Sequence, residues 1–456
     1  MNRVQQRRAI EALRAGVPNR DAVRALGSAQ PHIEERFVKL LQDARDGVAN
    51  GVQAPGWLIA GDFGSGKSHL LEYLQHVALE ENFVASKLVV SKETPLHDPA
   101  KLYRAAVETA VVPDRKGPAL AEIAASLRAD GPAFADLLAW AASAAPTWWN
   151  QPSSVPRGDE PVQEAPGPVG APLHGQAGTR HPADPGLNSR FPATLFLWER
   201  VTDPEVRSRI VGFWSGDPLG VGELRSWLRA HGQAAAYRLE SVVARELALQ
   251  RFRFTPRLIA AAGYAGWVLL VDEVELIARY SFRQRARSYA ELARWAGKLE
   301  GETFPGLTAV FAITSDFATA VLQGRNDEDA VPARLRASGL AGDQLLASRA
   351  QRGMRLITRE VARLRGPTRP AIAQAREQVR ALHAEAYGWD PPPLEADQRM
   401  TTTSMRQYVR RWINEWDLKR LYPGERVDTE FAELEIDLSE SLALETPSEE
   451  DADPGS

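Results

Sequence analysis

The amino-acid sequence predicts an α/β fold in which a parallel sheet, flanked by helices, is followed by a C-terminal helical lid. Short apolar runs alternate with segments of helical periodicity from residue 56 onward, as in strand–helix–strand units. Two of the apolar runs end in polar motifs, at residues 61–68 and 268–273, which are typical of P-loop nucleoside triphosphatases. Together these observations predict a P-loop NTPase fold of the AAA+ type.

The elements follow one another in a clear order. Helices are expected over residues 3–48, with glycine stops at Gly16 and Gly47. Strands and helices then alternate at 56–62, 67–82, 83–91 and 99–111. Helical stretches at 119–142 and 195–262 interrupt the sheet, which resumes with strands at 266–274 and 307–315 and a further candidate strand at 355–364. Helices at 371–387 and 403–421 close the pattern.

Composition and periodicity divide the chain into six parts. Residues 151–192 are dense in proline and glycine with few large apolar residues, so we expect a disordered insertion there. The predicted parts are an N-terminal helical segment (1–50), the first part of the P-loop core (51–150), the disordered insertion (151–192), a helical insertion with the remainder of the core (193–365), the helical lid (366–424) and an acidic, disordered tail (425–456).

The bulk composition is that of a soluble globular protein, with 44% hydrophobic and 25% charged residues in 456. Cysteine is absent, which excludes disulfides, thiolate zinc sites and cysteine nucleophiles. We find no apolar run of the ~20 residues that span a membrane and no signal peptide, so we expect a cytoplasmic protein. The net charge is −4, but residues 425–456 carry −11 and the rest +7. The mildly basic body leaves nucleic-acid contact open, although a solvated surface is the commoner explanation.

Residues 61–68 match the pattern G-x-x-x-x-G-K-[ST] at every specified position. Glycines let the backbone form a nest of N–H groups around a phosphate, and the following helix directs its positive N-terminal end at the same anion. The lysine supplies a charge at the β- and γ-phosphates, and the final hydroxyl ligates Mg²⁺. The predicted ATP-binding residues are Gly61, Asp62, Phe63, Gly64, Ser65, Gly66, Lys67 and Ser68, with His69 beside them.

The apolar run at 267–271 ends in two adjacent acids, Asp272 and Glu273. Burying neighbouring carboxylates is costly unless something positive binds there. We expect Asp272 and Ser68 to hold Mg²⁺ and Glu273 to polarise the attacking water. Taken alone, the pair could also be a strand that simply ends in charged residues.

Four further residues are candidates for supporting roles. Thr314 ends the strand at 307–315 and is predicted to sense the γ-phosphate, unless it only begins a turn. Arg406 opens the last helix and is predicted to reach the γ-phosphate from the lid, with an exposed surface arginine as the alternative. Arg334 and Arg336 are candidates for an arginine finger that serves a neighbouring subunit. The arginines at 279–294 are expected to form a solvated helix face, and Trp148-Trp149 a packing anchor.

Several segments together resemble one family. WLIAGDFGSGKSHLLEYL, AAGYAGWVLLVDEVELI and the N-terminal GVPNRD are similar to the ATP-binding proteins of BREX bacteriophage-defence systems, most closely the BrxD-like members. The resemblance covers roughly residues 7–148 and 195–421. It implies an ATPase of the origin-recognition-like branch of AAA+ proteins, with ATP and Mg²⁺ as cofactors and other defence proteins as partners. By the same resemblance, Val17, Pro18 and Arg20 would line the adenine pocket.

The resemblance also leaves alternatives open. A homo-oligomer is expected because AAA+ sites lie between subunits, and no membrane contact is expected. DNA contact stays open. Fewer than forty residues follow the lid, so a winged-helix domain does not fit there, and any contact would be made by the ATPase body or through a partner. Two other hypotheses are a nucleotide-gated scaffold with negligible turnover and a DNA-remodelling loader outside defence.

Overall fold

The structure is a computed structural model that describes residues 1–16, 19–28, 30–145, 186–394 and 405–423. Its centre is a six-stranded sheet with the order β3-β2-β4-β5-β1-β6. The strands are β1 (Trp57–Gly61), β2 (Val84–Val89), β3 (Ala110–Val111), β4 (Trp267–Asp272), β5 (Leu307–Thr314) and β6 (Ala362–Arg363). All neighbours pair in parallel except β3, which runs antiparallel to β2.

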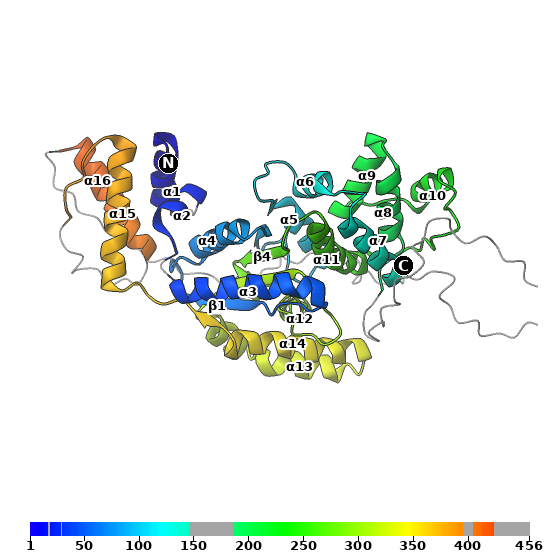
Figure 1. Ribbon diagram of the computed structural model, residues 1–456. Helices are drawn as coiled ribbons and strands as arrows, with labels where there is room; N and C mark the ends of the chain where they lie inside the picture. The colour runs from blue at the N-terminus through cyan, green and yellow to red at the C-terminus, as the bar shows by residue number, and fades with distance from the viewer. Residues whose placement is uncertain (17–18, 29, 146–185, 395–404, 424–456) are drawn as a thin grey trace, which may run out of the picture.

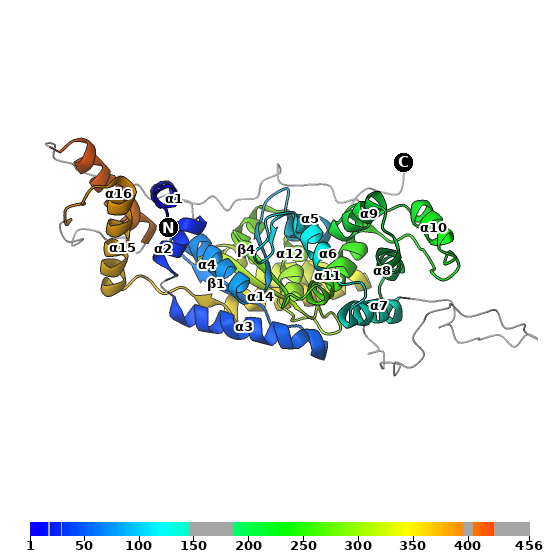
Figure 2. The same ribbon diagram turned by 45° about the horizontal axis from the view of Figure 1, so that its top comes forward.

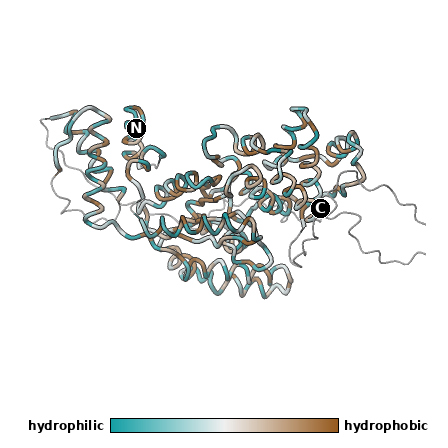
Figure 3. Tube along the Cα trace, in the orientation of Figure 1, coloured by the Kyte–Doolittle hydropathy of each residue, from teal (hydrophilic) through white to brown (hydrophobic). Residues whose placement is uncertain are grey.

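Two hydrophobic cores lie on the two faces of the sheet, because successive strand residues point to opposite faces. Helices α3 (Pro31–Asn50) and α4 (Lys67–Glu80) cover one face. The other face carries α5 (Pro99–Glu108), α11 (Ala244–Ala261), α12 (Phe282–Trp295) and α14 (Ala341–Arg359). Strands β1, β4 and β5 are buried along their whole length, which explains their continuous apolar sequences. Hydrophobic residues follow the strands and the helix sides that face them (Figure 3).

A helical unit extends the second core at one end of the molecule (Figures 1 and 2). It contains α6 (Ala119–Ser126), α7 (Pro132–Ala144), α8 (Arg190–Arg200), α9 (Pro204–Ser215) and α10 (Val221–Ala230), which pack beside α11. Its interior is aromatic, with Phe191, Trp214 and Phe254 in ring contact. Leu187 and Phe191 are buried, so residues 186–192 belong to this unit and not to the proline-rich insertion. The rest of that insertion and Trp148-Trp149 lie outside the described residues.

At the opposite end, the first two and the last two described helices pack together (Figures 1 and 2). Helices α1 (Arg3–Ala15) and α2 (Arg20–Leu26) form one hydrophobic core with α15 (Arg369–Tyr387) and α16 (Met405–Leu421). We call these four helices the terminal helical unit. Asp417 links three of these helices: from α16 it pairs with Arg14 of α1 and accepts a hydrogen bond from His383 Nε2 of α15 at 3.1 Å.

Two sequence-based boundaries are wrong. The candidate strand at 355–364 is mostly the end of α14, and only Ala362–Arg363 form a strand. Tertiary packing explains the helix: at Gly353 it passes so close to the Tyr289 carbonyl of α12 that a β-carbon would overlap it. The helix expected to stop at Gly47 continues to Asn50, and Gly51, with a φ of 67°, forms the cap. Glycine is needed at position 47 because a β-carbon there would lie 2.3 Å from the carbonyl oxygen of Val52.

The expectation of a solvated arginine face at 279–294 is also wrong in part. Arg285 is buried and forms an ion pair with Asp327 of α13 (Asp327–Ala337) at 2.8 Å. Arg294 is buried between Glu291 and Glu302, at 2.9 and 2.6 Å. The physical reason is that α12 is packed against other elements, so each buried arginine is paired with a carboxylate: Arg285 with Asp327 of α13, and Arg294 with Glu291 of its own helix and Glu302 of the following loop. Two short helical turns, η2 (Val274–Arg279) and η3 (Ala318–Gln323), complete this side.

Candidate nucleotide-binding site

The predicted phosphate loop connects β1 to α4. Gly64 and Gly66 have φ values of 75° and 95°, a region that side chains rarely adopt. Ser65 N donates to the Asp62 carbonyl at 3.1 Å, and Leu70 N donates to the Gly66 carbonyl at 2.8 Å, which starts α4 at Lys67. The first N–H groups of α4 therefore remain directed at the loop, an arrangement that suits a bound anion. Ser68 is the second residue of this helix.

Lys67 is the cation of this loop and is only 8% exposed. Its ammonium donates to the carbonyl oxygens of Gly61 at 2.9 Å and Asp62 at 3.3 Å. Its nearest carboxylate in an ion pair is Glu275, at 4.0 Å between Nζ and Oε1. The lysine thus lies folded against its own loop, with an acid from the turn after β4 beside it.

The two predicted acids lie at the end of β4. Asp272 is buried, and its Oδ1 accepts a hydrogen bond from Glu273 N at 3.0 Å. Glu273 has a φ of 56°, an uncommon conformation for a residue other than glycine, and such strain concentrates at functional sites. Burial raises the pKa of Glu273, the charge of Asp272 raises it further, and Lys67 lowers it. A carboxylate with a raised pKa is a better proton acceptor than an ordinary glutamate.

Thr314 ends β5, which lies between β1 and β4. In the parallel ladder it pairs with Gly61, the first residue of the phosphate loop. Its Oγ1 is buried and has no hydrogen-bond partner among the described residues, and the same holds for Ser65 Oγ in the loop. Buried hydroxyls are usually satisfied, so these two groups have hydrogen-bonding capacity left for a polar ligand.

Glu275 was missed by the sequence analysis. It is 5% exposed, lies in the turn η2, and its Oε2 has no partner among the described residues. Burial raises the pKa of Glu275, while Lys67 acts to lower it. The signal in the sequence was a third acid in Asp272-Glu273-Val274-Glu275, but its apolar neighbours gave no reason to expect an inward orientation.

Arg406, the second residue of α16, lies beside Phe63 of the phosphate loop. Its Nε donates to the Gly16 carbonyl at 3.0 Å, and its guanidinium carbon lies 6.0 Å from the centre of the Phe63 ring. Burial lowers the pKa of Arg406, and Arg410 lowers it further. The terminal helical unit therefore meets the loop through this arginine. Val17 and Pro18, expected to line the adenine pocket, lie outside the described residues, and Arg20 begins α2.

The remaining predicted residues lie elsewhere or make packing contacts. His69 is engaged with the N-terminal segment, since its Nε2 lies 2.8 Å from the Gly27 carbonyl, and burial lowers its pKa. Arg334 and Arg336 are exposed on α13. Arg334 lies over the Phe282 ring at 5.3 Å and Arg336 hydrogen-bonds Gln351 at 2.5 Å. Neither of these contacts involves the phosphate loop of the same chain.

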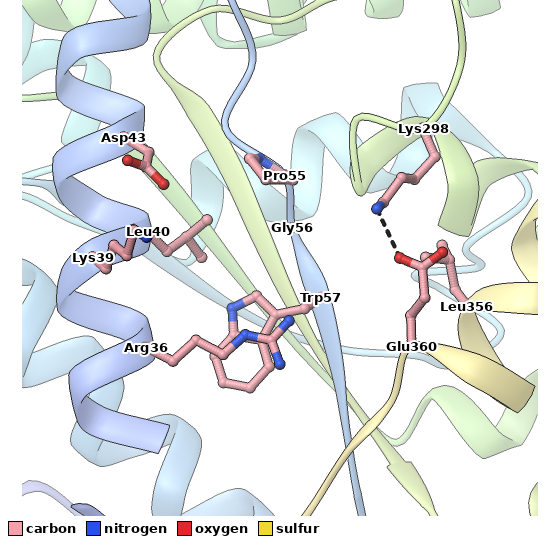
Figure 4. Close-up of a pocket in the computed structure, with 10 residues that line it drawn as sticks. All are labelled: Arg36, Lys39, Leu40, Asp43, Pro55, Gly56, Trp57, Lys298, Leu356 and Glu360. Carbon is pink, nitrogen blue, oxygen red and sulfur yellow. Dashed lines mark hydrogen bonds and ion pairs between the residues drawn. The ribbon is translucent and has the colours of Figure 1, made fainter. Parts of the chain in front are cut away.

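A separate pocket lies at the opposite end of β1 (Figure 4). It has a volume of about 320 Å³ and lies between α3, the start of β1 and the end of α14. Trp57 lies in its wall with the Arg36 guanidinium 4.3 Å above the ring, and Lys298 pairs with Glu360 across it at 2.7 Å. Trp57 begins the strand that Gly61 ends, so this pocket is distinct from the phosphate loop.

Two further features were sought in the described part of the chain. Those residues contain no group of three histidines or acids placed to hold a metal ion. They also contain no helix that is long and apolar enough to span a membrane.

Comparison with known proteins identifies the family. A family profile described as BREX system ATP-binding protein BrxC/D matches residues 1–127 and 222–419, which together make up more than half of the chain. The matched ranges contain the phosphate loop, the acids that follow β4, Thr314 and Arg406. Searches among curated proteins and among solved structures returned no match. The chain therefore belongs to the BREX system ATP-binding protein BrxC/D family.

Proposed function

We propose that this protein is a Mg²⁺-dependent ATPase of the AAA+ type, and that its nucleotide cycle drives a switch or motor in a BREX phage-defence complex. The observation that carries the proposal is the convergence of Lys67, Asp272, Glu273 and Thr314 at the carboxyl ends of β1, β4 and β5. In open α/β sheets this edge is where ligands bind.

Binding of ATP relies on the loop and the start of α4. The backbone N–H groups of residues 64–68 surround the β-phosphate, and Lys67 neutralises the β- and γ-phosphates. Ser68 and Asp272 would hold Mg²⁺, and both are oxygen donors of the kind this ion prefers. Two protein ligands are enough when phosphate oxygens and waters supply the others, which agrees with the lack of a larger acid cluster in the described residues. When bound there, Mg²⁺ would supply positive charge to offset the negative charge of the phosphates.

Hydrolysis would use Glu273 and Thr314. Glu273 accepts a proton from a water molecule while the oxygen of that water bonds to the γ-phosphorus. The bond between the γ-phosphorus and the β–γ bridging oxygen breaks, and ADP is released. The unpartnered hydroxyl of Thr314 lies between the loop and the acids, so it suits a role in orienting the water or the γ-phosphate. Arg406 would contact the γ-phosphate when the terminal helical unit closes over the nucleotide.

Assembly is part of the proposal. The described cations at the loop are Lys67 and Arg406, so additional charge for the transition state would come from a neighbouring subunit or a partner, with Arg334 and Arg336 as candidates. Defence-system partners follow from the family, and DNA contact would occur through the body of the protein or through a partner. A scaffold that binds ATP without turnover is the second candidate, but the strained Glu273 beside Asp272 favours hydrolysis.

Lys67→Ala tests the proposal directly. The variant should lose ATP binding in a calorimetric titration, because the phosphates lose their main side-chain counter-ion. Lys92→Ala, which removes an exposed lysine after β2, is the control and should bind as the wild type does. Steady-state phosphate release, measured with and without defence partners and DNA, then separates an ATPase from a scaffold. An unchanged affinity of Lys67→Ala for ATP would contradict the assignment of residues 61–68 as the nucleotide-binding site.

A further inference from the structure

The contact between Lys67 and Glu275 has a consequence for the nucleotide cycle. Glu275 is buried, its Oε2 has no partner among the described residues, and its Oε1 lies 4.0 Å from Lys67 Nζ. A buried carboxylate is costly unless a positive group compensates it. Lys67 is the cation that acts on it, while Asp272 and Glu273 both repel it. Glu275 therefore depends on the same lysine that ATP requires.

We propose that Glu275 is a positioning residue that competes with the phosphates of the nucleotide for Lys67. When ATP binds, Lys67 must turn from Glu275 and from the carbonyls of Gly61 and Asp62 toward the phosphates. Glu275 then stays buried with its negative charge uncompensated, close to a ligand of the same sign. Both effects weaken nucleotide binding. When phosphate and ADP leave, Glu275 takes Lys67 back, which favours product release.

The position of Glu275 in the fold separates it from the catalytic acids. Asp272 ends β4 and Glu273 is the strained residue that follows, whereas Glu275 lies in η2, the turn beyond them. Its contact with Lys67 therefore joins the end of β4 to the phosphate loop after β1, across the intervening strand β5. The inference rests on the proposed nucleotide site, because it describes how that site is regulated.

The test is Glu275→Gln, which keeps the shape of the side chain and removes its charge. A fluorescent ATP analogue is titrated into the full chain, once with Mg²⁺ and once with EDTA, and release of the matching ADP analogue is followed after a chase with unlabelled nucleotide. We expect affinity to rise about tenfold, equivalent to ~1.4 kcal/mol, under both conditions, and ADP release to slow by a similar factor. Glu93→Gln removes an exposed negative charge after β2 and should leave both quantities unchanged.

The outcomes separate the two proposals. If Lys67→Ala binds the analogue as well as the wild type does, the nucleotide site itself is wrong. If Lys67→Ala loses binding but Glu275→Gln binds equally or more weakly, only the competition is wrong. Weaker binding confined to Mg²⁺ would assign Glu275 to the metal instead and overturn the inference. Should Glu275→Gln not fold, Glu275→Asp withdraws the carboxylate from Lys67, and an affinity no higher than that of the wild type overturns it equally.

Discussion

Gly61 and Thr314 pair directly in the parallel ladder between β1 and β5, although they are far apart in sequence. Gly61 begins the phosphate loop and Thr314 ends its strand, so the pairing brings an unpartnered buried hydroxyl to the loop. The ladder continues from β5 to β4, which ends in Asp272. Three strand ends thus gather the residues on which the proposed function depends.

Thr314→Val should lower turnover while leaving ATP affinity nearly unchanged. Valine has the same shape, but it lacks the hydroxyl that would orient the water or the γ-phosphate. We expect a loss of kcat of about 10-fold or more, as when one hydrogen bond made in the transition state is removed. Thr308→Val, in the same strand and also buried, is the matched control. Equal losses of turnover in the two variants would mean that Thr314 has only a structural role.

Glu273→Gln should preserve ATP binding and reduce turnover by ~10² or more, because an amide cannot accept the proton of the attacking water. The measurement is phosphate release under saturating ATP, with binding followed separately by calorimetry. Turnover equal to that of the wild type would mean that another group is the base. Glu275→Gln, in contrast, is expected to change the affinity for nucleotide.

Efficient hydrolysis should depend on assembly. Arg334→Ala or Arg336→Ala should lower turnover by up to ~10³, the magnitude measured for arginine fingers in other P-loop enzymes, without weakening ATP binding to the isolated chain. Arg352→Ala removes an exposed arginine of the neighbouring helix α14 and serves as the control. Specific activity should also rise with protein concentration or on addition of a defence partner.

Mixing variant chains distinguishes action between subunits from action within one. Chains with Arg334→Ala or Arg336→Ala should regain activity when combined with Glu273→Gln chains, because each supplies the group that the other lacks. If activity stays flat with concentration and mixing restores nothing, the charge acts within one chain. Arg406, beside Phe63 and Gly16, would then be the residue to replace.

Asp417→Asn should destabilise the protein by about 2 kcal/mol, because it removes the charge that Arg14 and His383 share. Burial acts to raise the pKa of Asp417, but the hydrogen bond from His383 and the charge of Arg14 hold that pKa below its usual value. A lowered pKa contributes stability above the ordinary aspartate range that is lost as the pH falls. The check is the denaturation midpoint at pH 7 and at a pH below 3.8, the ordinary pKa of aspartate: the difference between variant and wild type should shrink at the lower pH. Asp390→Asn, an exposed acid, should have little effect at either.

Much of the site could be predicted from the sequence because its demands are local. A loop that needs left-handed glycines, a lysine at the start of a helix and a strand that ends in two acids are each encoded in contiguous residues. The continuous apolar sequences of β1, β4 and β5 likewise predicted buried strands, since both faces of these strands are covered.

The relationships between these segments were decided only by the tertiary structure. The order of the strands brings Thr314 to Gly61 and Glu275 to Lys67. The packing of α12 against α14 made a helix of residues expected to form a strand, and the packing around α12 buried arginines expected in solvent. The physical reason is that backbone conformation and capping depend on neighbours in sequence, whereas burial, ion pairing and helix crossing depend on residues that meet only after folding.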